Sequence, residues 1–309
     1  MRLSTALAIV VAAGIRTPAE EMPAVGHIIV FGDIQIEKDV RQLLPSVPPI
    51  FDDAEANELR KKLAGSHLWR QSDFTYVCCE SSGTAILYLG VKTTDERPRF
   101  RQKPSGFARL DAEDLALYDQ LMAINQDAVF KSISRSEDDS AGHALSSYSP
   151  ERNLQEDVIA RAKGHVPRWR DVLLHCADPH QRAAAAYLLA YGPKDQMLAD
   201  LLAQASSDSD PLVRNNAMRA LGVLAPSAVS RRRHLRFDPE GLINLFQSVH
   251  WTDWNKASFA LLALIDVGSP KLLHDIARRA GEPLSQIATW PSMHAKPGVV
   301  ILQRIQELQ

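Results

Sequence analysis

The chain has 309 residues, of which 45% are hydrophobic and 23% are charged, which are ordinary values for a soluble globular protein. A chain of this length allows two domains. The formal net charge of -2 gives no support for a nucleic-acid partner, and none is expected. Three cysteines cannot form a disulfide framework, and their odd number leaves one thiol free unless it pairs between chains.

Residues 1–19 are predicted to be a signal peptide. Arg2 gives a minimal positive region, an apolar run follows over residues 3–14, and Thr17–Ala19 offers small residues for cleavage. The run is shorter than the roughly 20 apolar residues of a membrane-spanning helix. We therefore predict a periplasmic or secreted protein with no transmembrane segment after cleavage. The alternative is a cytoplasmic protein whose apolar N-terminus is buried.

Residues 27–95 are predicted to form a small α+β unit in the order strand, helix, helix, strand, strand. The five elements are expected at residues 27–36, 39–44, 54–64, 74–80 and 84–92. Asp52 or Asp53 is placed to cap the second helix, and Gly65 to follow its end as a C′ glycine. The turn Ser81–Gly83 predicts that the last two strands form a hairpin.

This unit resembles a POTRA domain over residues 28–94. The resemblance rests on Val30–Asp33, Phe51–Asp52, Leu63–Trp69 leading into Phe74, and the hairpin that ends in Leu89–Val91. It implies that the edge of the sheet pairs with extended segments of partners in secretion and envelope machinery.

Residues 105–165 are predicted to be a helical and flexible connector. Apolar residues recur at helical spacing over residues 110–134, with Asp111 at the start. Residues 134–150 are rich in Ser, Asp and Gly and predict a mobile linker. A further helix is expected over residues 153–163.

The second half of the chain contains an internal repeat. Asp178–Leu189 and Asp210–Leu221 share an Asp-Pro start, an arginine and an Ala- and Leu-rich helix, and a third copy is expected from Asp253. The successive periods of about 32 and 43 residues indicate helical hairpins. The expected pairs are 169–176 with 181–191, 195–205 with 211–224, 239–249 with 252–265, and 270–280 with part of 283–309.

The residue types explain the repeat. The aspartates are expected to cap their helices, and Arg182 and Arg214 to reach the capping carboxylates four residues earlier. Ala185 and Ala217 allow close approach of neighbouring units, whose seam is filled by leucines. Residues 167–276 thus resemble HEAT (armadillo-like) repeats. The resemblance implies a mostly α fold, with an α-solenoid over residues 166–309 that presents an extended concave surface.

Motifs for catalysis are absent from the sequence. It has no GxSxG, phosphate-binding loop, kinase signature or HExxH, so no catalytic residue, metal or cofactor is predicted. Cys78 and Cys79 lie next to each other in a strand, which favours two separate thiols over a redox pair. Cys176 is expected in the core, although a long-range disulfide from it to the hairpin stays open. The tryptophans Trp251, Trp254 and Trp290 are expected in the core or at caps.

We therefore expect a non-enzymatic protein-binding scaffold or adaptor of the bacterial cell envelope, whose partner the sequence does not identify. The predicted partner-binding residues are Arg182, Arg214, Arg219, Arg231, Arg232 and Arg233. The last three form a basic cluster in an insertion of the repeat, and a merely solvated loop is the alternative there. The alternative functions are a HEAT-like enzyme, either a lyase or metal-dependent, and a cytosolic regulatory adaptor.

Overall fold

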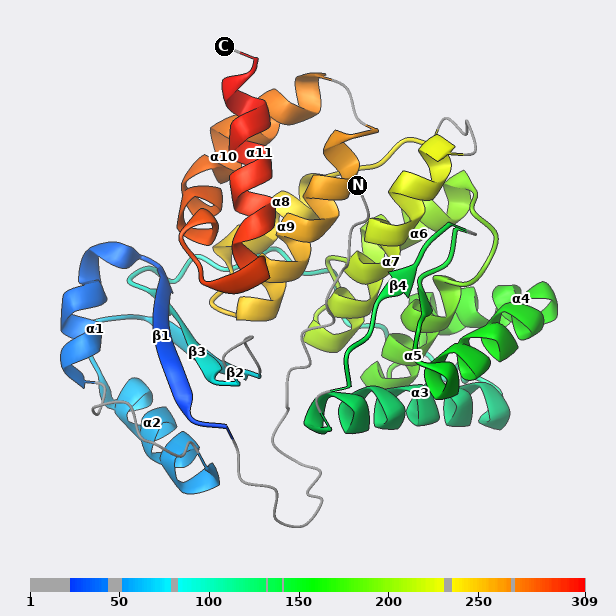
Figure 1. The fold of residues 1–309 in the computed structure, drawn as a ribbon, viewed down its shortest axis with the longest axis horizontal. Coiled ribbons are helices and arrows are strands. Elements are labelled where there is room, and N and C mark those ends of the chain that lie inside the picture. Colours follow the sequence, from blue (N-terminus) through cyan, green and yellow to red (C-terminus); the bar gives the residue numbers. More distant parts are fainter. Residues whose placement is uncertain are drawn as a thin grey trace.

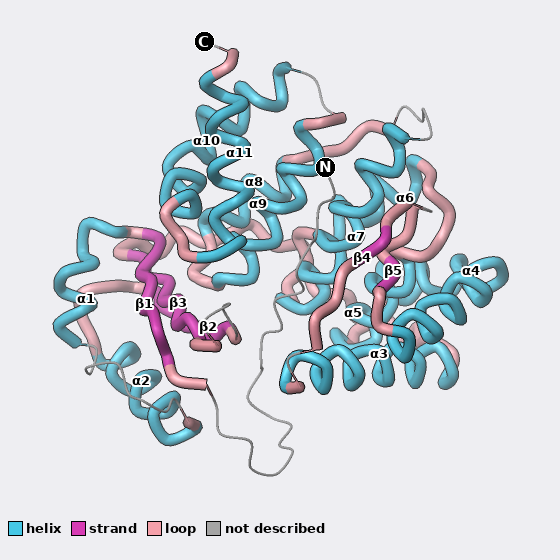
Figure 2. The backbone as a smooth tube through the Cα atoms, in the orientation of Figure 1, coloured by secondary structure: helices cyan, strands magenta, loops and turns pink. Residues whose placement is uncertain are grey.

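The computed structural model describes residues 23–43, 52–78, 83–131, 133–140, 142–230, 235–267 and 270–308. As predicted, the fold is mostly helical with a small mixed sheet (Figures 1 and 2). The predicted signal peptide and the cluster Arg231–Arg233 lie outside the described residues. Within them, no helix is long and apolar enough to cross a membrane.

The N-terminal unit has the predicted order of elements. These are β1 (Val25–Gly32), α1 (Glu37–Leu43), α2 (Asp53–Gly65), β2 (Gln71–Val77) and β3 (Ala85–Lys92). The central strand β3 pairs in parallel with β1 and antiparallel with β2, which confirms the hairpin. Asp52 caps α2 as predicted, because its side chain accepts hydrogen bonds from the amides of Ala54 and Glu55. Gly65 is instead the last helical residue, and Ser66 is the C-cap.

The sheet is buried on both faces, because its side chains alternate between two cores. Leu87 and Leu89 belong to the core that includes α1 and α2, whereas Ile86 and Tyr88 belong to the core of the helical part. Gly90 also faces the helical part, and the carbonyl of Val249 lies where a Cβ atom would be. The sheet therefore packs closely on the helices rather than standing apart from them.

Aromatic side chains fill the junction between the sheet and the helices. The ring of Phe31 lies 5.0 Å from that of Trp254, and the ring of Tyr88 lies 5.0 Å from both Trp251 and Trp290. All three tryptophans are buried, as predicted. Such rings bury large apolar areas, so this cluster joins the two parts of the molecule.

The helical part consists of successive helix pairs. Its helices are α3 (Ala112–Phe130), α4 (Ser149–His175), α5 (Pro179–Leu189), α6 (Gln196–Ala205), α7 (Pro211–Ser230), α8 (Glu240–Asn244), α9 (Trp251–Ile265), α10 (Pro270–Ala288) and α11 (Lys296–Gln306). The pairs α4–α5, α6–α7, α8–α9 and α10–α11 agree with the predicted pairing. The second helices α5, α7, α9 and α11 contact one another in that order (Figure 1).

Helix α4 differs from the prediction of two separate helices. It runs through Pro167, so the boundary predicted at residue 166 falls inside it. An internal proline removes one backbone hydrogen bond and disfavours a helix. Here Val166 and Trp169, on either side of the proline, are buried in the core. Tertiary packing thus overrides the local signal.

The stretch predicted as a mobile linker also differs from that expectation. It contains a short hairpin of β4 (Glu137–Asp138) and β5 (Leu145–Ser146). Leu145 is buried, and the amide of Ser146 donates to the Gln155 side chain at 2.7 Å. These few contacts fix the hairpin against α4 even though its composition is polar.

Residues 97–110 run as an extended segment along the turns of the helix pairs. The amide of Arg101 donates to the carbonyl of Ser207 at 2.7 Å, and that of Gly106 to His175 at 2.8 Å. Ala177 in turn donates to the carbonyl of Gly106 at 2.9 Å. This backbone pairing connects two successive turns of the helical part.

The third copy of the repeat begins at His250 rather than at Asp253. His250 is the residue before α9, as Asp178 and Asp210 are before α5 and α7. The indole of Trp254 donates to the carbonyl of Ser248 at 2.8 Å, where Arg214 donates to that of Asp208 at 2.9 Å. A tryptophan thus replaces the arginine in this copy. With this register, Ala257 and Leu261 occupy the places of Ala185 and Leu189, and all four are buried.

Buried Arg–Asp pairs connect consecutive units. Arg182 donates through Nε and Nη2 to the carboxylate of Asp208 at 3.0 and 2.8 Å. Arg214 donates in the same way to Asp253, with both distances 2.8 Å. The predicted caps at Asp178 and Asp210 are confirmed. The predicted pairing of each arginine with its own cap is wrong, because each guanidinium reaches the following unit.

Replacing Asp208 with alanine is expected to destabilise the protein strongly. The guanidiniums of Arg182 and Arg101 both bond to this carboxylate, and the substitution would leave a buried charge without its partner. Such a loss costs about 3–5 kcal/mol. Urea denaturation would measure it, with Asp266→Ala as the control, because the pair of Asp266 with Arg304 is exposed and 3.7 Å long. We call the pairs Arg182–Asp208 and Arg214–Asp253 the ladder. Equal free energies of unfolding for the two variants would contradict its structural role.

A second ion pair predicts pH-dependent stability at the junction with the sheet. Nδ1 of His250 lies 2.7 Å from a carboxylate oxygen of Asp73 on β2, and this hydrogen bond raises the pKa of His250 above its ordinary 6.5. The contact between protonated His250 and Asp73 therefore stabilises the folded protein fully below about pH 6.5. This contribution is lost as the pH rises through the pKa that His250 has in the folded state.

Asp73→Asn is therefore expected to lower the free energy of unfolding more at pH 6 than at pH 8.5. Denaturation at both pH values would test this, with Asp39→Asn on the exposed side of α1 as the control. A loss of stability in Asp73→Asn that is the same at both pH values would count against the ion pair.

Candidate binding site

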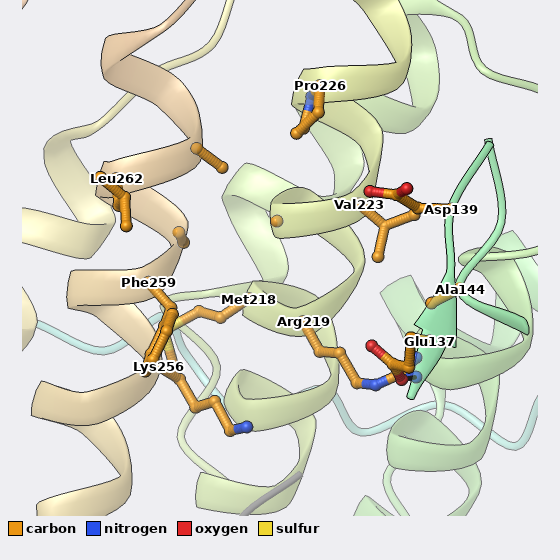
Figure 3. Close-up of a pocket in the computed structure, with 13 residues that line it drawn as sticks. Glu137, Asp139, Ala144, Met218, Arg219, Val223, Pro226, Lys256, Phe259 and Leu262 are labelled. Carbon is orange, nitrogen blue, oxygen red and sulfur yellow. Dashed lines mark hydrogen bonds and ion pairs between the residues drawn. The ribbon is translucent and has the colours of Figure 1, made fainter. Parts of the chain in front are cut away.

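A pocket lies between α7 and α9, and the β4–β5 hairpin forms one of its walls (Figure 3). We call it the α7–α9 pocket; its cavity volume is about 50 Å³. The lining residues are Glu137, Asp139, Ala144, Met218, Arg219, Gly222, Val223, Pro226, Lys256, Phe259, Ala260, Leu262 and Ala263. Most are apolar, and the charged members are two carboxylates and two cations.

Helical spacing brings the lining residues to one face of each helix. On α7, Met218, Gly222 and Pro226 are four residues apart, so they follow one another along the helix. On α9, Lys256 and Phe259 are three residues apart and likewise share a face. The glycine at position 222 contributes no side chain, and open space lies where its Cβ atom would be. The small residue therefore helps to leave the pocket open.

Arg219 is held in place by partners on two neighbouring elements. Its guanidinium pairs with the carboxylate of Glu137 on β4 at 2.5 Å and lies 5.3 Å from the ring centre of Tyr187 on α5. Burial alone would lower the pKa of Arg219, but the charge of Glu137 outweighs it and keeps this pKa well above its ordinary value. The positive charge of Arg219 is therefore compensated within the protein.

Lys256 forms no such ion pair with a described residue. Lys256 is only 8% exposed, and its side chain extends from α9 toward α7 in Figure 3. Burial, and after it the charge of Arg219, lower the pKa of Lys256 from 10.5 to about 8, while the charge of Glu137 acts in the opposite direction. Among the described residues, none accepts a hydrogen bond from its amine. The pocket thus contains a largely buried lysine whose amine forms no hydrogen bond or ion pair with a described residue.

The charge of Lys256 also affects His294, near the start of α11. Burial, and after it the charge of Lys256, lower the pKa of His294 from 6.5 to about 4. Nδ1 of His294 lies 3.3 Å from the side-chain oxygen of Asn255. The imidazole is therefore neutral at pH 7 and adds no positive charge beside the amine.

The arginines that are predicted to bind a partner lie in different environments. Arg182 and Arg214 are 1% exposed and fully engaged in the ladder, so their prediction as surface contacts is wrong. Both arginines lie in the first turn of their helices. Their guanidiniums lie between two units and donate to an aspartate of the next unit. Arg219 does line the pocket, although Glu137 occupies its guanidinium.

Two important residues of the pocket were not predicted from the sequence. Lys256 lies in α9, where the other charged residue is Asp253. A lysine in so apolar a helix is a usable signal, because lysine is almost never fully buried without a partner. Glu137 lies in the stretch predicted to be a mobile linker, and its polar neighbours in the sequence give no signal of an ordered ion pair.

A second cluster resembles a metal site but is explained by protein contacts. Single ligand atoms of Asp111, Asp114 and His165 lie within 4.8 Å of one another. Arg161 and the indole of Trp169 already donate to Asp114 at 2.6 and 2.7 Å. Burial raises the pKa of Asp114, but hydrogen bonds from Trp169, Arg161 and His165 outweigh it and lower this pKa. The adjacent guanidinium would also repel a metal ion, so this network fits a structural link between α3 and α4.

The cysteines differ in part from expectation. Cys176 is free and buried, as predicted, and the long-range disulfide left open for it does not form. Its sulfur accepts a hydrogen bond from Arg109 at 3.0 Å. Cys78 is disulfide-bonded, which contradicts the prediction of a separate thiol there.

No protein-family model and no curated protein matches the chain. Among solved structures, it is similar to the crystal structure of an engineered protein from the Northeast Structural Genomics Consortium. The two are 18% identical, with a TM-score of 0.36, and the match covers 63% of this chain and 80% of that chain. A TM-score this low supports no argument about fold or function.

Replacing Lys256 with methionine is expected to stabilise the protein at neutral pH. Because the pKa falls from 10.5 to about 8 on folding, the charged amine destabilises the native state by about 3 kcal/mol below pH 8. This penalty disappears as the pH rises from 8 to 10.5. The gain in Lys256→Met should therefore be largest at pH 7 and small at pH 10 in urea denaturation.

The control for this experiment is Lys62→Met, because Lys62 is exposed on α2. It should leave the free energy of unfolding nearly unchanged at both pH values. A Lys256→Met variant that is less stable than the wild type at pH 7 would show that the amine has a partner in the folded protein.

Proposed function

We propose that the chain is a non-enzymatic scaffold that binds a protein partner, with the α7–α9 pocket as a central contact. The observation that carries this proposal is the combination of apolar walls and an uncompensated amine between two consecutive second helices. A group of this kind is costly for folding alone, whereas binding sites commonly keep such groups. The pocket accepts one protruding side chain of a partner.

The repeat supports the finer part of the proposal, a HEAT-type α-solenoid over residues 166–309. The Asp-capped helix starts, the matching small residues Ala185, Ala217 and Ala257, and the serial packing of α5, α7, α9 and α11 all favour it. Solenoids of this type stack similar units and present one continuous surface for binding.

The sheet supports a second contact of the same scaffold. Strand β1 lies at one edge of the order β1-β3-β2, so one of its sides has no strand partner among the described residues. An extended segment of a partner could pair there by strand addition, as the POTRA-like resemblance implies. Action in the periplasm or outside the cell is part of the proposal and rests on the predicted signal peptide.

Site-specific photocrosslinking tests the proposal. Benzoylphenylalanine in place of Val223, which lines the pocket, should crosslink one discrete partner in cells. The same probe at Glu156, on the exposed side of α4, should not. Crosslinks of equal yield at both positions, or none at Val223, would contradict a protein contact at this pocket.

A further inference from the structure

We infer that the α7–α9 pocket is a carboxylate-binding site, in which the amine of Lys256 receives an acidic side chain of the partner polypeptide. The source of the carboxylate, a polypeptide, rests on the proposed function. The site itself does not, because it follows from the charges and walls of the pocket.

The first argument is the balance of charge. Glu137 pairs with Arg219 at 2.5 Å, so these two charges compensate each other. Lys256 then leaves one positive charge in the buried part of the pocket. Asp139 also lines the pocket, but it is exposed and lies at the far end from Lys256 in Figure 3. A group that enters beside the amine therefore meets a net positive charge, which selects an anion.

The second argument concerns hydrogen bonding. Buried polar groups are nearly always paired, and an isolated ammonium in an apolar environment is very costly. The amine of Lys256 has three donors and no acceptor among the described residues. A carboxylate supplies acceptor oxygens and an opposite charge together, so it meets both needs.

The third argument is the size and character of the walls. Met218, Phe259 and Ala260 are apolar and would contact the stem that carries the carboxylate. The cavity of about 50 Å³ is far below the roughly 300–1,000 Å³ of pockets for drug-sized ligands. It therefore suits one acidic side chain on a larger partner better than a whole metabolite.

The decisive experiment uses propionate as a probe and propionamide as its uncharged match. Incorporation of ¹³C-labelled lysine makes the ε-carbon of each lysine visible by NMR without altering the amine, and comparison with Lys256→Met assigns the signal of Lys256. We expect saturating propionate to raise the pKa of Lys256 by at least one unit, because the carboxylate favours the charged amine. Propionamide should leave it unchanged. If propionate leaves it unchanged as well, or binds Lys256→Met as tightly as the wild type, the inference is overturned.

A second arm identifies the source of the carboxylate. A library of capped hexapeptides with one fixed glutamate between apolar residues is compared with the matched glutamine library. Selection of glutamate peptides at least tenfold over glutamine peptides, by the wild type and by Lys62→Met but not by Lys256→Met, supports both the site and its polypeptide partner. Binding of propionate without any glutamate peptide would keep the carboxylate site and remove the support for a protein partner there. Crosslinking at Val223 without a propionate response would keep the protein partner and remove the carboxylate site.

Discussion

The carboxylate of Asp208 is the contact on which the arrangement of the helical part depends. It receives the guanidinium of Arg182 from the preceding unit and that of Arg101 from the extended segment. Burial raises the pKa of Asp208, but the bonds from Arg182, the amide of Asp210 and Arg101 outweigh it and lower this pKa. The guanidinium of Arg101 also donates to the carbonyl of Leu173 at 2.7 Å, and its side chain is 13% exposed. The pair can therefore stay ionised although Asp208 is fully buried.

Buried ion pairs of this kind set the register of the structure more clearly than they add net stability. A hydrophobic seam of Ala and Leu tolerates sliding by one turn, whereas a bidentate Arg–Asp contact permits one position only. The pair of Arg214 with Asp253 fixes α7 against α9 in this way. Arg219 and Lys256 follow a few residues later on the same two helices, so this pair also determines how the charged groups of the pocket face each other.

Much of this architecture was predictable, because the signals were local and repeated. The helix pairs follow from apolar spacing, and the caps at Asp52, Asp178 and Asp210 follow from residues next to the helices they serve. The third copy begins three residues earlier than predicted, because Trp254 donates where the first two copies use arginine. No propensity rule anticipates that an indole can replace a guanidinium in this contact.

The errors share one physical cause, which is that long-range contacts override local composition. Pro167 and the polar stretch around Glu137 predict breaks in order, yet both are held by side chains distant in the sequence. The partners of Arg182 and Arg214 were wrong for the same reason. The aspartate nearest in the sequence is the expected partner, whereas the fold brings the carboxylate of the following unit within hydrogen-bonding distance.

The pocket differs from the rest of the core because burial of the charged Lys256 destabilises the folded state. In the core, Arg182 pairs with Asp208 and Arg214 with Asp253, whereas Lys256 lies in an apolar helix and forms no ion pair with a described residue. A ligand that binds only the folded state raises stability by RT ln(1 + [L]/Kd). A carboxylate beside this amine would relieve the penalty of burying its charge, so its binding free energy and the stability of the fold are linked.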